Sequence, residues 1–444
     1  MLFYYMDIGW RSLRRTPLVS ILMVCAIAIG IGITMTSLSV YHMMSMDPIP
    51  AKSDRLFAVQ LNTMDDNTDW WSDDNMPFQL TFKDAMHLHK LKLNDRDENI
   101  DIRKTAMLVA QFAVHMNNDE MAPFLAMTRI AGREFFPMFE REFVYGSSWS
   151  QEQENNAEAV IVINQELNER LFGGSNSVGK EIYLDDTPFR IVGVMQQWDI
   201  HTKFYDVNNG PFDSPEPIFM PITLVEPNQI DTAGNTNGWK YGDINSWEDF
   251  LQSENFWLQF WVELDNKQET QRFEDYLLAY LTEEATKGRF EREVPSFSVR
   301  DVNNWLDYRG VVSEDNKVLV GLSFLFLAVC LANILGLLLG KFLRRAPEVG
   351  VRRALGASKR QVFLQHLVEV SILGLLGGSL GIAIAQLGLW GVRTTSGNYQ
   401  ALATMDLGML LAAPAIAIVS CIIAGLYPAW LVCKTQPAIY LKTQ

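Results

Sequence analysis

The chain has 444 residues, a net charge of −15 and a hydrophobic fraction of 48%. This length allows two or three domains. The apolar residues gather in four uncharged runs, which excludes a protein that is soluble over its whole length.

Residues 1–16 include the segment YYMDIGWRSLRR, in which Tyr5 and Ile8 alternate with Asp7 and Arg11. This pattern predicts a cytoplasmic amphipathic helix at the membrane interface, anchored by aromatic side chains. A simple extension of the first membrane span is the alternative interpretation, and the sequence leaves both open.

Residues 17–46 form an uncharged run that exceeds the roughly 20 residues a helix needs to cross a bilayer. The run is also longer than the roughly 7–15 apolar residues of a signal peptide, so we interpret it as a retained anchor. Neither Gly nor Pro interrupts its last part before Pro48. We therefore predict transmembrane helix 1 over 17–46 and expect its end to form a stalk.

Residues 47–315 alternate strand and helix patterns, which indicates an α+β domain in two lobes. Strands are predicted at 56–63, 107–116 and 256–265, helices at 82–91 and 268–285, and a strand followed by a helix at 158–174. The segments 180–186 and 189–196 are predicted to form a hairpin that turns at Thr187-Pro188. The stretch 197–255 is rich in Asn, Asp, Gly, Pro and Trp, so we expect loops there. The domain contains no cysteine, and its fold therefore needs no disulfide.

The segment DDNTDWWSDDN, residues 65–75, combines five Asp with Trp70 and Trp71. A solvated acidic loop is the simplest interpretation, and a site for a cation or a partner is the alternative. His87 and His89 lie two apart on a predicted helix and point to different faces. We therefore expect no metal site.

The segment GSNSVGKE, residues 174–181, resembles the start of a nucleotide-binding P-loop, but Glu181 stands where Ser or Thr would bind magnesium. A P-loop joins a strand to the helix that follows it, whereas here a helix precedes the glycines and a strand follows. Glu181 would also repel phosphate. We expect a helix-ending turn at this position and no cofactor bound by the chain.

The remaining spans are predicted over 316–343, 359–392 and 406–433. The connecting segments are 344–358, 393–405 and the tail 434–444. Charged residues are almost absent from the spans, which disfavours an ion-coupled transporter. His366 and Glu369 lie at i and i+3 and are predicted to form a hydrogen-bonded pair. The small residues Gly374, Gly377, Gly378 and Gly381 permit close helix packing, either within one subunit or in a dimer.

The connection between spans two and three reads APEVGVRRALGASKRQV, residues 346–362. Pro347 begins a short helix, Glu348 lies near its positive end and Gly356 ends it. Ser358 can cap the next helix. Docking of a cytoplasmic partner and a basic hinge on anionic lipid are both consistent with this pattern.

The distribution of charge predicts the orientation of the chain. Residues 47–315 contain 23 Lys and Arg and 48 Asp and Glu, a net charge of −25. The other segments contain 14 basic and 4 acidic residues, a net charge of +10. Because basic residues favour the cytoplasmic side of a membrane, we expect both termini and the 344–358 segment in the cytoplasm. The 47–315 domain and the 393–405 loop are then expected on the other side.

Several motifs together resemble those of a known family. EVGVRRALGASKRQV resembles the signature of the FtsX-like permease family, as do ILGLLGGSLG (372–381) and GLYPAWLVCKTQPAIYLK (425–442). Cys433 and Tyr440 depart from the alanines that are common there. NERLFGGSNSVGKEIYLDDTPFRIVGVM resembles the periplasmic core domain of MacB-type permeases.

The resemblance implies a type VII ABC transporter, in which dimers of four-span permeases work by mechanotransmission with two nucleotide-binding domains. It implies a periplasmic domain with a split lobe, 50–115 and 255–310, and an inserted lobe, 116–254. It also implies that the short cytoplasmic helix contacts the ATPase. The residues concerned are Glu348, Val349, Gly350, Val351, Arg352, Arg353, Ala354, Leu355 and Gly356.

We therefore expect a multi-pass protein of the bacterial inner membrane that is not itself an enzyme and drives efflux or extrusion. The expected partners are a separate cytoplasmic ATPase dimer that binds ATP and Mg, a second permease (identical or homologous), a periplasmic adaptor, a TolC-like outer-membrane duct and membrane lipid. We expect no nucleic acid among them. A lipoprotein-extracting permease and a non-transporting regulator of a periplasmic hydrolase or sensor are the alternatives.

Overall fold

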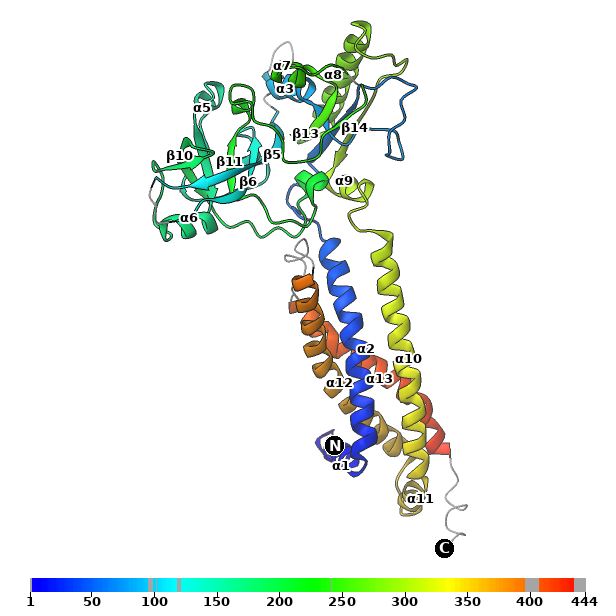
Figure 1. Cartoon of the computed structure of the whole chain (residues 1–444). Helices are drawn as coiled ribbons and strands as arrows, with labels where there is room; N and C mark the ends of the chain where they lie inside the picture. The colour runs from blue at the N-terminus through cyan, green and yellow to red at the C-terminus, as the bar shows by residue number, and fades with distance from the viewer. Residues whose placement is uncertain are drawn as a thin grey trace. The chain divides into compact units, whose positions relative to one another are not determined.

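The computed structural model describes residues 2–94, 99–100, 102–117, 121–240, 242–395 and 407–434. It divides into two compact units (Figure 1). The helical unit is Met1–Met46 with Val312–Gln444, and the sheet unit is Asp47–Val311. Most of the predicted 393–405 loop, and the predicted tail after residue 434, lie outside the described residues.

The helical unit has four helices that are long and apolar enough to cross a membrane, within the part of the chain that the structure describes. They are α2 (Pro17–Met44), α10 (Glu314–Arg344), α12 (Lys359–Thr395) and α13 (Leu407–Lys434). At 1.5 Å per residue, the 28 residues of α2 extend about 42 Å and the 37 residues of α12 about 55 Å. Both lengths exceed the roughly 30 Å of a bilayer's hydrocarbon core.

Two short helices complete this unit. α1 (Leu2–Arg15) is separated from α2 by Thr16, whose φ of −129° and ψ of 65° are not helical. α1 is therefore a helix of its own, and it packs mainly on α12. α11 (Ala346–Ala354) lies between α10 and α12.

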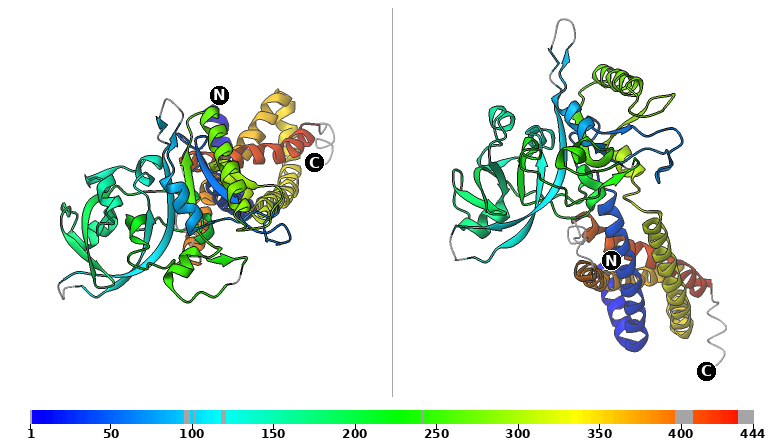
Figure 2. Two further views of the ribbon diagram at one scale, coloured as in Figure 1. Left: turned by 90° about the horizontal axis from the view of Figure 1, so that it is seen from above. Right: turned by 45° about the horizontal axis from the view of Figure 1, so that its top comes forward.

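The core of the helical unit forms around α12, which packs on α2, α13 and α1. α10 packs on α2 and α13 (Figures 1 and 2). Side chains such as Ile27, Ile31 and Ile334 are 0–1% exposed, so the helices of this unit cover them without any lipid.

The sheet unit is built on a single path of hydrogen-bonded strands among the described residues. The order is β14 (Ser296–Asp301), β1 (Leu56–Asn62), β13 (Asn255–Glu263), β5 (Lys104–His115), β6 (Phe124–Ala131), β11 (Ile218–Pro221), β8 (Val160–Asn164), β10 (Thr187–Met195) and β7 (Phe143–Gly146). β2 (Leu80–Thr81) and β12 (Asn237–Gly238) pair with β13, and β9 (Glu181–Leu184) pairs with β10 and β5. β3 (Leu93–Asn94) pairs separately with β4 (Asn99–Ile100).

The pairing is mostly antiparallel, but β10 with β8 and β11 with β6 are parallel. The long strand β5 connects the two parts of the path, because its start pairs with β13 and its end with β9 (Figure 2). Helices cover the sheet: α3 (Phe82–Lys90), α4 (Phe135–Met138), α5 (Gln151–Asn155), α6 (Gln165–Phe172), α7 (Trp247–Gln252), α8 (Lys267–Thr286) and α9 (Val302–Tyr308). Short 3-10 turns are η1 (Phe204–Asn209) and η2 (Ile222–Leu224).

Two buried arginines organise polar clusters within the sheet unit. Arg129, which is fully buried, contacts Asp206 and Glu216 at 2.5 Å each. Arg289 contacts Asp84 at 2.6 Å and Glu254 at 2.9 Å. Each buried cation is thus matched by carboxylates, which is the condition under which charges are tolerated in a core.

Two expectations for this unit are wrong in detail. The stretch 197–255 is not all loop, because β11 lies inside it, fully buried between β6 and β8. The hairpin of β9 and β10 turns at Asp185 and Asp186, with φ of 46° and 66°, and not at Thr187-Pro188. A two-residue hairpin turn of this kind needs positive φ at both positions, which Asp tolerates and the ring of Pro188 forbids.

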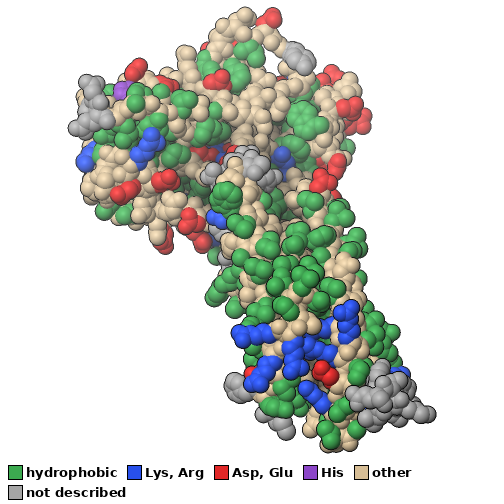
Figure 3. Space-filling model, turned by 60° about the horizontal axis from the view of Figure 1, so that its bottom comes forward, with side chains coloured by type: hydrophobic (Ala, Val, Ile, Leu, Met, Phe, Trp, Pro, Cys, Tyr) green, Lys and Arg blue, Asp and Glu red, His purple; other side chains and the backbone are tan. Residues whose placement is uncertain are grey.

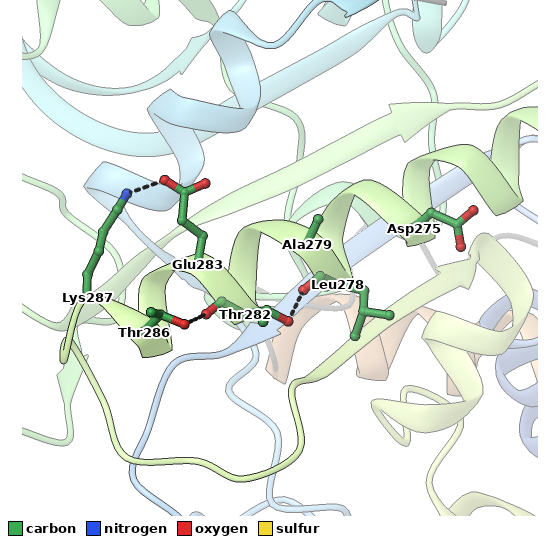
Figure 4. A pocket seen from close by; sticks show the side chains of 7 residues that line it. All are labelled: Asp275, Leu278, Ala279, Thr282, Glu283, Thr286 and Lys287. Atoms are coloured by element: carbon green, nitrogen blue, oxygen red, sulfur yellow. Dashed lines mark hydrogen bonds and ion pairs between the residues drawn. The ribbon is translucent and has the colours of Figure 1, made fainter.

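The outer face of α8 forms a shallow hollow of about 740 Å³ (Figure 4). Its lining residues are Asp275, Leu278, Ala279, Thr282, Glu283, Thr286 and Lys287. All of them belong to one helix or follow it directly, so the hollow is an open helix face and not an enclosed site.

Candidate functional site

The short helix α11 is bounded by residues that stop the helices on either side of it. Arg345 separates it from α10, and Gly356 follows its end with a φ of 105°, which glycine adopts without strain. Ser358 then caps α12: its Oγ accepts from the backbone N of Gln361 at 3.2 Å, and its own N donates to Gln361 Oε1 at 2.9 Å. This reciprocal pair is a capping box, and the predicted cap at Ser358 is confirmed.

α11 has a buried face and an exposed face. Ala346, Val349 and Gly350 are buried against the helical unit. Val351 is 49% exposed and Leu355 is 84% exposed. Pro347 is exposed as well, so an apolar stripe at i, i+4 and i+8 faces outward. Adjoining apolar side chains that are exposed and rimmed by polar residues are typical of an interaction site with a protein or a membrane.

Charged side chains flank this stripe and connect α11 to its neighbours. Glu348 and Arg352 are exposed beside it, one turn apart. Arg352 Nη1 donates to Gln365 Oε1 of α12 at 3.3 Å, and Arg353 Nη1 donates to the carbonyl oxygen of Cys433 in α13 at 3.1 Å. The helix is therefore fixed to two transmembrane helices by its basic side.

The residues expected to contact an ATPase thus divide into two groups. Glu348, Val351, Arg352, Ala354, Leu355 and Gly356 are exposed. Val349 and Gly350 are buried and Arg353 is partly buried, so these three hold the helix in place. The first group presents most of the surface that a partner could touch in this conformation, and its Arg352 also holds α11 on α12.

Lys and Arg side chains gather at the end of the helical unit that carries α11, and hydrophobic side chains cover the adjacent visible surface (Figure 3). The exposed basic residues there include Arg344, Arg352, Lys359 and Arg360. This is the distribution expected where a helix bundle emerges from a membrane.

A buried ion pair lies beside α11, and sequence reasoning missed its main partner. Glu369 Oε1 is 2.6 Å from Lys341 Nζ, and both side chains are at most 2% exposed. Ser12 of α1 donates its hydroxyl to Glu369, and Arg345 donates to that hydroxyl and, at 3.0 Å, to the carbonyl oxygen of Ser12. The cluster therefore joins α1, α10, α12 and the start of α11.

The expected hydrogen bond between His366 and Glu369 is wrong. His366 Nδ1 lies 3.8 Å from Glu369 Oε2, beyond hydrogen-bond distance. The His366 ring instead lies 4.1 Å from the Phe342 ring. Lys341 was missed because it lies at the end of another span, and only the fold brings it to Glu369.

The four glycines of α12 lie against two different helices. A Cβ at Gly374 would be 2.9 Å from Ile418 Cα, and one at Gly378 would be 2.8 Å from Ala417 Cβ, both in α13. A Cβ at Gly377 would be 2.5 Å from Ile27 Cγ2, and one at Gly381 would be 2.9 Å from Ile31 Cγ2, both in α2. These glycines thus let α12 pack closely on neighbours within the same chain.

The P-loop-like segment of the sheet unit uses its own polar groups internally. Gly179 N donates to the carbonyl oxygen of Ile191 at 2.8 Å, and Lys180 N donates to that of Ser177 at 3.0 Å. Lys180 lies 4.7 Å from the Phe172 ring. The segment follows α6 and precedes β9, as predicted, so its amides are not arranged to cradle a phosphate.

The acidic loop 65–75 is largely paired within the sheet unit. Asp74 contacts Arg300 at 2.7 Å, and Asp66 contacts Arg292 at 3.0 Å. His87 hydrogen-bonds to Tyr276, and His89 lies 3.2 Å from Glu154. Within the described ranges, no group of three or more His, Cys, Asp or Glu is arranged to hold a metal ion.

Comparison with known proteins bears on both units. The family model of the MacB-like periplasmic core domain matches residues 20–280, and that of the FtsX-like permease C-terminal region matches residues 320–437. The macrolide export ATP-binding/permease protein MacB of Syntrophobacter fumaroxidans is 23% identical over 333 residues, 69% of this chain and 46% of the relative. The pyoverdine export ATP-binding/permease protein PvdT of Pseudomonas fluorescens is 24% identical over 324 residues, 72% of this chain and 43% of the relative.

A further relative and a solved structure are also similar to this chain. The uncharacterized ABC transporter permease YvrN of Bacillus subtilis is 22% identical over 70% of this chain and 68% of the relative. The periplasmic region of MacB from Actinobacillus actinomycetemcomitans is 14% identical, with a TM-score of 0.34, over 58% of this chain and 94% of that one. This chain spans less than half the length of the MacB and PvdT relatives described above.

The first family model alone covers more than half of the chain, and the second covers the helices that follow. The chain therefore belongs to the MacB-like family of FtsX-type ABC transporter permeases.

Proposed function

We propose that this chain is the permease subunit of an efflux transporter and that it docks a cytoplasmic ABC ATPase through α11. The observation that carries the proposal is the exposed stripe of Pro347, Val351 and Leu355, flanked by Glu348 and Arg352. The ATPase would bind the ATP and Mg, and the permease would supply no catalytic group.

The chemistry of the stripe favours a protein partner over a lipid surface. Anionic lipid attracts basic side chains but gains nothing from Glu348, which it repels. A groove on a partner protein can cover Leu355 and pair both Glu348 and Arg352, as in other helix-in-groove contacts. Leu355, which is 84% exposed, is an apolar side chain that such a groove would cover.

The contacts around α11 explain how docking would be converted into movement. α11 is tied to α12 by Arg352 and to α13 by Arg353, and Arg345 ties its start to α1. When two ATPase subunits close on ATP, a displacement of α11 would therefore move the transmembrane helices together with it. We propose that α2 and α10, which lead into and out of residues 47–311, relay this movement to the periplasmic domain with its split and inserted lobes.

The orientation follows from the charge distribution. The basic end of the helical unit would lie in the cytoplasm with both termini, and the acidic residues 47–315 would lie in the periplasm. The named relatives export macrolides and pyoverdine. We propose a small molecule, peptide or toxin as the substrate, a second identical or homologous permease, and an adaptor with a TolC-like duct.

Variants of α11 test the docking step. We expect Leu355→Glu, and separately Glu348→Ala with Arg352→Ala, to reduce recovery of the ATPase with the tagged permease by about tenfold, because each removes part of a buried contact. The control is Glu314→Ala with Lys317→Ala, an exposed acid–base pair 2.8 Å apart at the other end of α10. Recovery of the ATPase at wild-type levels with the α11 variants, in membranes that retain folded permease, would overturn the docking role.

Purification of the native complex tests the rest of the proposal. We expect mass spectrometry to find an ABC ATPase domain together with an adaptor and an outer-membrane duct. A lipoprotein carrier in their place would favour lipoprotein extraction, and a wall hydrolase without a duct would favour the regulator. A complex without any ATPase domain would refute all three.

A further inference from the structure

A small cavity in the sheet unit has a wall of aromatic rings and hydrogen-bond donors. Its volume is about 130 Å³. The lining residues are Trp70, Trp71, Phe78, Gln79, Asn208, Asn235, Asn237, Phe256 and Arg309. They come from the loop after β1, from η1, from the segment around β12, from β13 and from the end of α9, so only the folded unit assembles them.

Three of these side chains have buried donors without a partner. Trp70 Nε1, Gln79 Nε2 and Asn208 Nδ2 make no hydrogen bond to the described residues. Gln79 is only 4% exposed. The orientation of the Asn208 amide is set by Arg309, whose Nη1 donates to Asn208 Oδ1. Buried donors are normally paired, so three around one cavity point to an acceptor that binds there.

Arg309 adds a positive charge that has no carboxylate within ion-pair distance in the described ranges, although Asp206 acts on it from farther away and raises its pKa. Its guanidinium lies 3.8 Å from the Phe78 ring and 5.2 Å from the Trp305 ring, and it donates a hydrogen bond to the neutral side chain of Asn208. Burial lowers the pKa of Arg309 to about 10. In contrast, the carboxylates around Arg129 and Arg289 outweigh burial and raise the pKa of both.

The aromatic wall determines what else could fit. Trp70 and Trp71 are stacked with ring centroids 3.9 Å apart, and Trp70 meets Phe256 edge-on at 5.3 Å. Trp71 is 61% exposed and forms an accessible edge. An apolar cavity of about 150 Å³ holds one benzene. This smaller cavity therefore has room for a carboxylate, and a ring attached to that carboxylate would lie against the exposed Trp71.

We propose that this cavity binds a carboxylate attached to a small apolar or aromatic group, with Arg309 as the charged anchor. The acidic loop does not forbid this, since Asp66 and Asp74 are paired with Arg292 and Arg300. Hydrogen-bond donors repel cations. Their presence here therefore argues against the alternative interpretation of residues 65–75 as a cation site. The carboxylate could belong to a free small molecule or to the C-terminus of a peptide, and the chemistry of recognition is the same.

Calorimetric titration of the full chain in lipid nanodiscs tests the site without any ATPase. The probes are benzoate, its uncharged analogue benzamide and the cation benzylammonium. We expect benzoate to bind with a dissociation constant of about 1 mM, and benzamide at least about tenfold more weakly, because a charged hydrogen bond is lost. Benzylammonium should not bind.

Variants assign the binding to this cavity. Arg309→Met should weaken benzoate binding at least about tenfold, whereas Arg55→Met, a control at an exposed ion pair with Asp265, should not change it. If Arg309→Met fails to fold, Trp71→Ala tests the site in its place, because this exposed side chain can be removed without opening the core. We expect Trp71→Ala to weaken benzoate binding severalfold. A peptide ending in Phe with a free carboxylate, compared with its C-terminal amide, then separates the two sources: preference for the free peptide over benzoate identifies a peptide terminus.

The proposal is overturned if benzoate and benzamide bind equally, if neither carboxylate probe binds, or if the folded Arg309→Met and Trp71→Ala variants bind benzoate like the wild type. None of these results depends on whether the chain docks an ATPase.

Discussion

Glu369 illustrates how a single charged residue is accommodated inside an apolar helix. Its carboxylate has Lys341 at 2.6 Å and the hydroxyl of Ser12 as partners, each from a different helix. Removing one partner leaves the other charge buried and unpaired, which is strongly destabilising. Replacing both partners by apolar side chains leaves no buried charge and costs much less. The pair is therefore expected to specify how the helices meet more than to raise their stability.

A double-mutant cycle tests this expectation. We predict that Lys341→Met and Glu369→Leu each destabilise the helical unit by about 3–5 kcal/mol, and that the double variant recovers most of the loss. Thermal unfolding in detergent, followed by circular dichroism, measures the effect, with the exposed Lys317→Met as control. Simple addition of the two losses would contradict a coupled pair.

Glu216 in the sheet unit allows a prediction about acid. Burial raises the pKa of Glu216, but the charges of Arg129 and then Lys203 outweigh it and hold the pKa at about 2, below the ordinary 4.5. Because the folded state binds the proton less readily than the unfolded state, the contribution is complete above about pH 4.5. It is lost as the pH falls from 4.5 towards 2.

We therefore expect the urea midpoint of the full chain, followed by tryptophan fluorescence, to decrease as the pH falls from 4.5 towards 2. Glu216→Gln should be less stable at pH 7 by about 3–5 kcal/mol and should lose less on acidification. Glu226→Gln, an exposed glutamate, serves as the control. An identical acid dependence in Glu216→Gln and wild type would mean that another group is responsible.

At the scale of elements, segments with a clear periodic pattern or clear boundaries could be predicted from the sequence, and segments with neither could not. The helices over 82–91 and 268–285 and the strands at 56–63 and 107–116 correspond to α3, α8, β1 and β5. β11 was missed because Ile218–Pro221 do not alternate apolar and polar residues and lie in a polar stretch, whereas β9, equally short, was found as part of a hairpin.

Part of the candidate site could also be predicted from the sequence, and part of it could not. Pro347, Gly356 and Ser358 predict α11 and its boundaries, because helix-capping and helix-breaking residues act on their immediate neighbours in the chain. The exposure of Leu355, and the meeting of Lys341 with Glu369, depend on contacts between residues far apart in sequence. No local sequence pattern could predict the exposure of Leu355 or this ion pair.

The glycines of α12 give a prediction whose sign depends on position. A Cβ at Gly377 would meet Ile27 Cγ2 at 2.5 Å, whereas one at Gly336 in α10 would have no atom within 4 Å. Gly377→Ala should therefore destabilise the helical unit by about 1–3 kcal/mol, and Gly336→Ala should stabilise it by about 0.5–1 kcal/mol. Thermal unfolding of both variants in detergent measures the difference.

A compensating change separates a steric effect from a loss of flexibility. Ile27→Ala combined with Gly377→Ala makes room for the added methyl group, so we expect partial recovery of stability relative to Gly377→Ala alone. If the double variant loses the sum of both single effects, the close approach of α12 to α2 does not limit this position.

At the scale of the whole molecule, the opposite charges of the two units predict which side of the membrane each occupies. Protease added to intact spheroplasts should degrade residues 47–311 and spare a tag fused to the C-terminus, because basic flanks hold that end in the cytoplasm. Lysed spheroplasts, in which both parts become accessible, are the control. Protection of residues 47–311 together with loss of the tag would reverse the proposed orientation.

The positions of the four cysteines have a practical consequence. Cys25, Cys330, Cys421 and Cys433 all belong to the helical unit and none forms a disulfide, while residues 47–311 contain no thiol. Oxidants and reductants therefore cannot form or break a disulfide within the sheet unit. A cysteine introduced at any exposed position there would be the unit's sole thiol, so a thiol-specific spectroscopic label on it would follow that unit's movements.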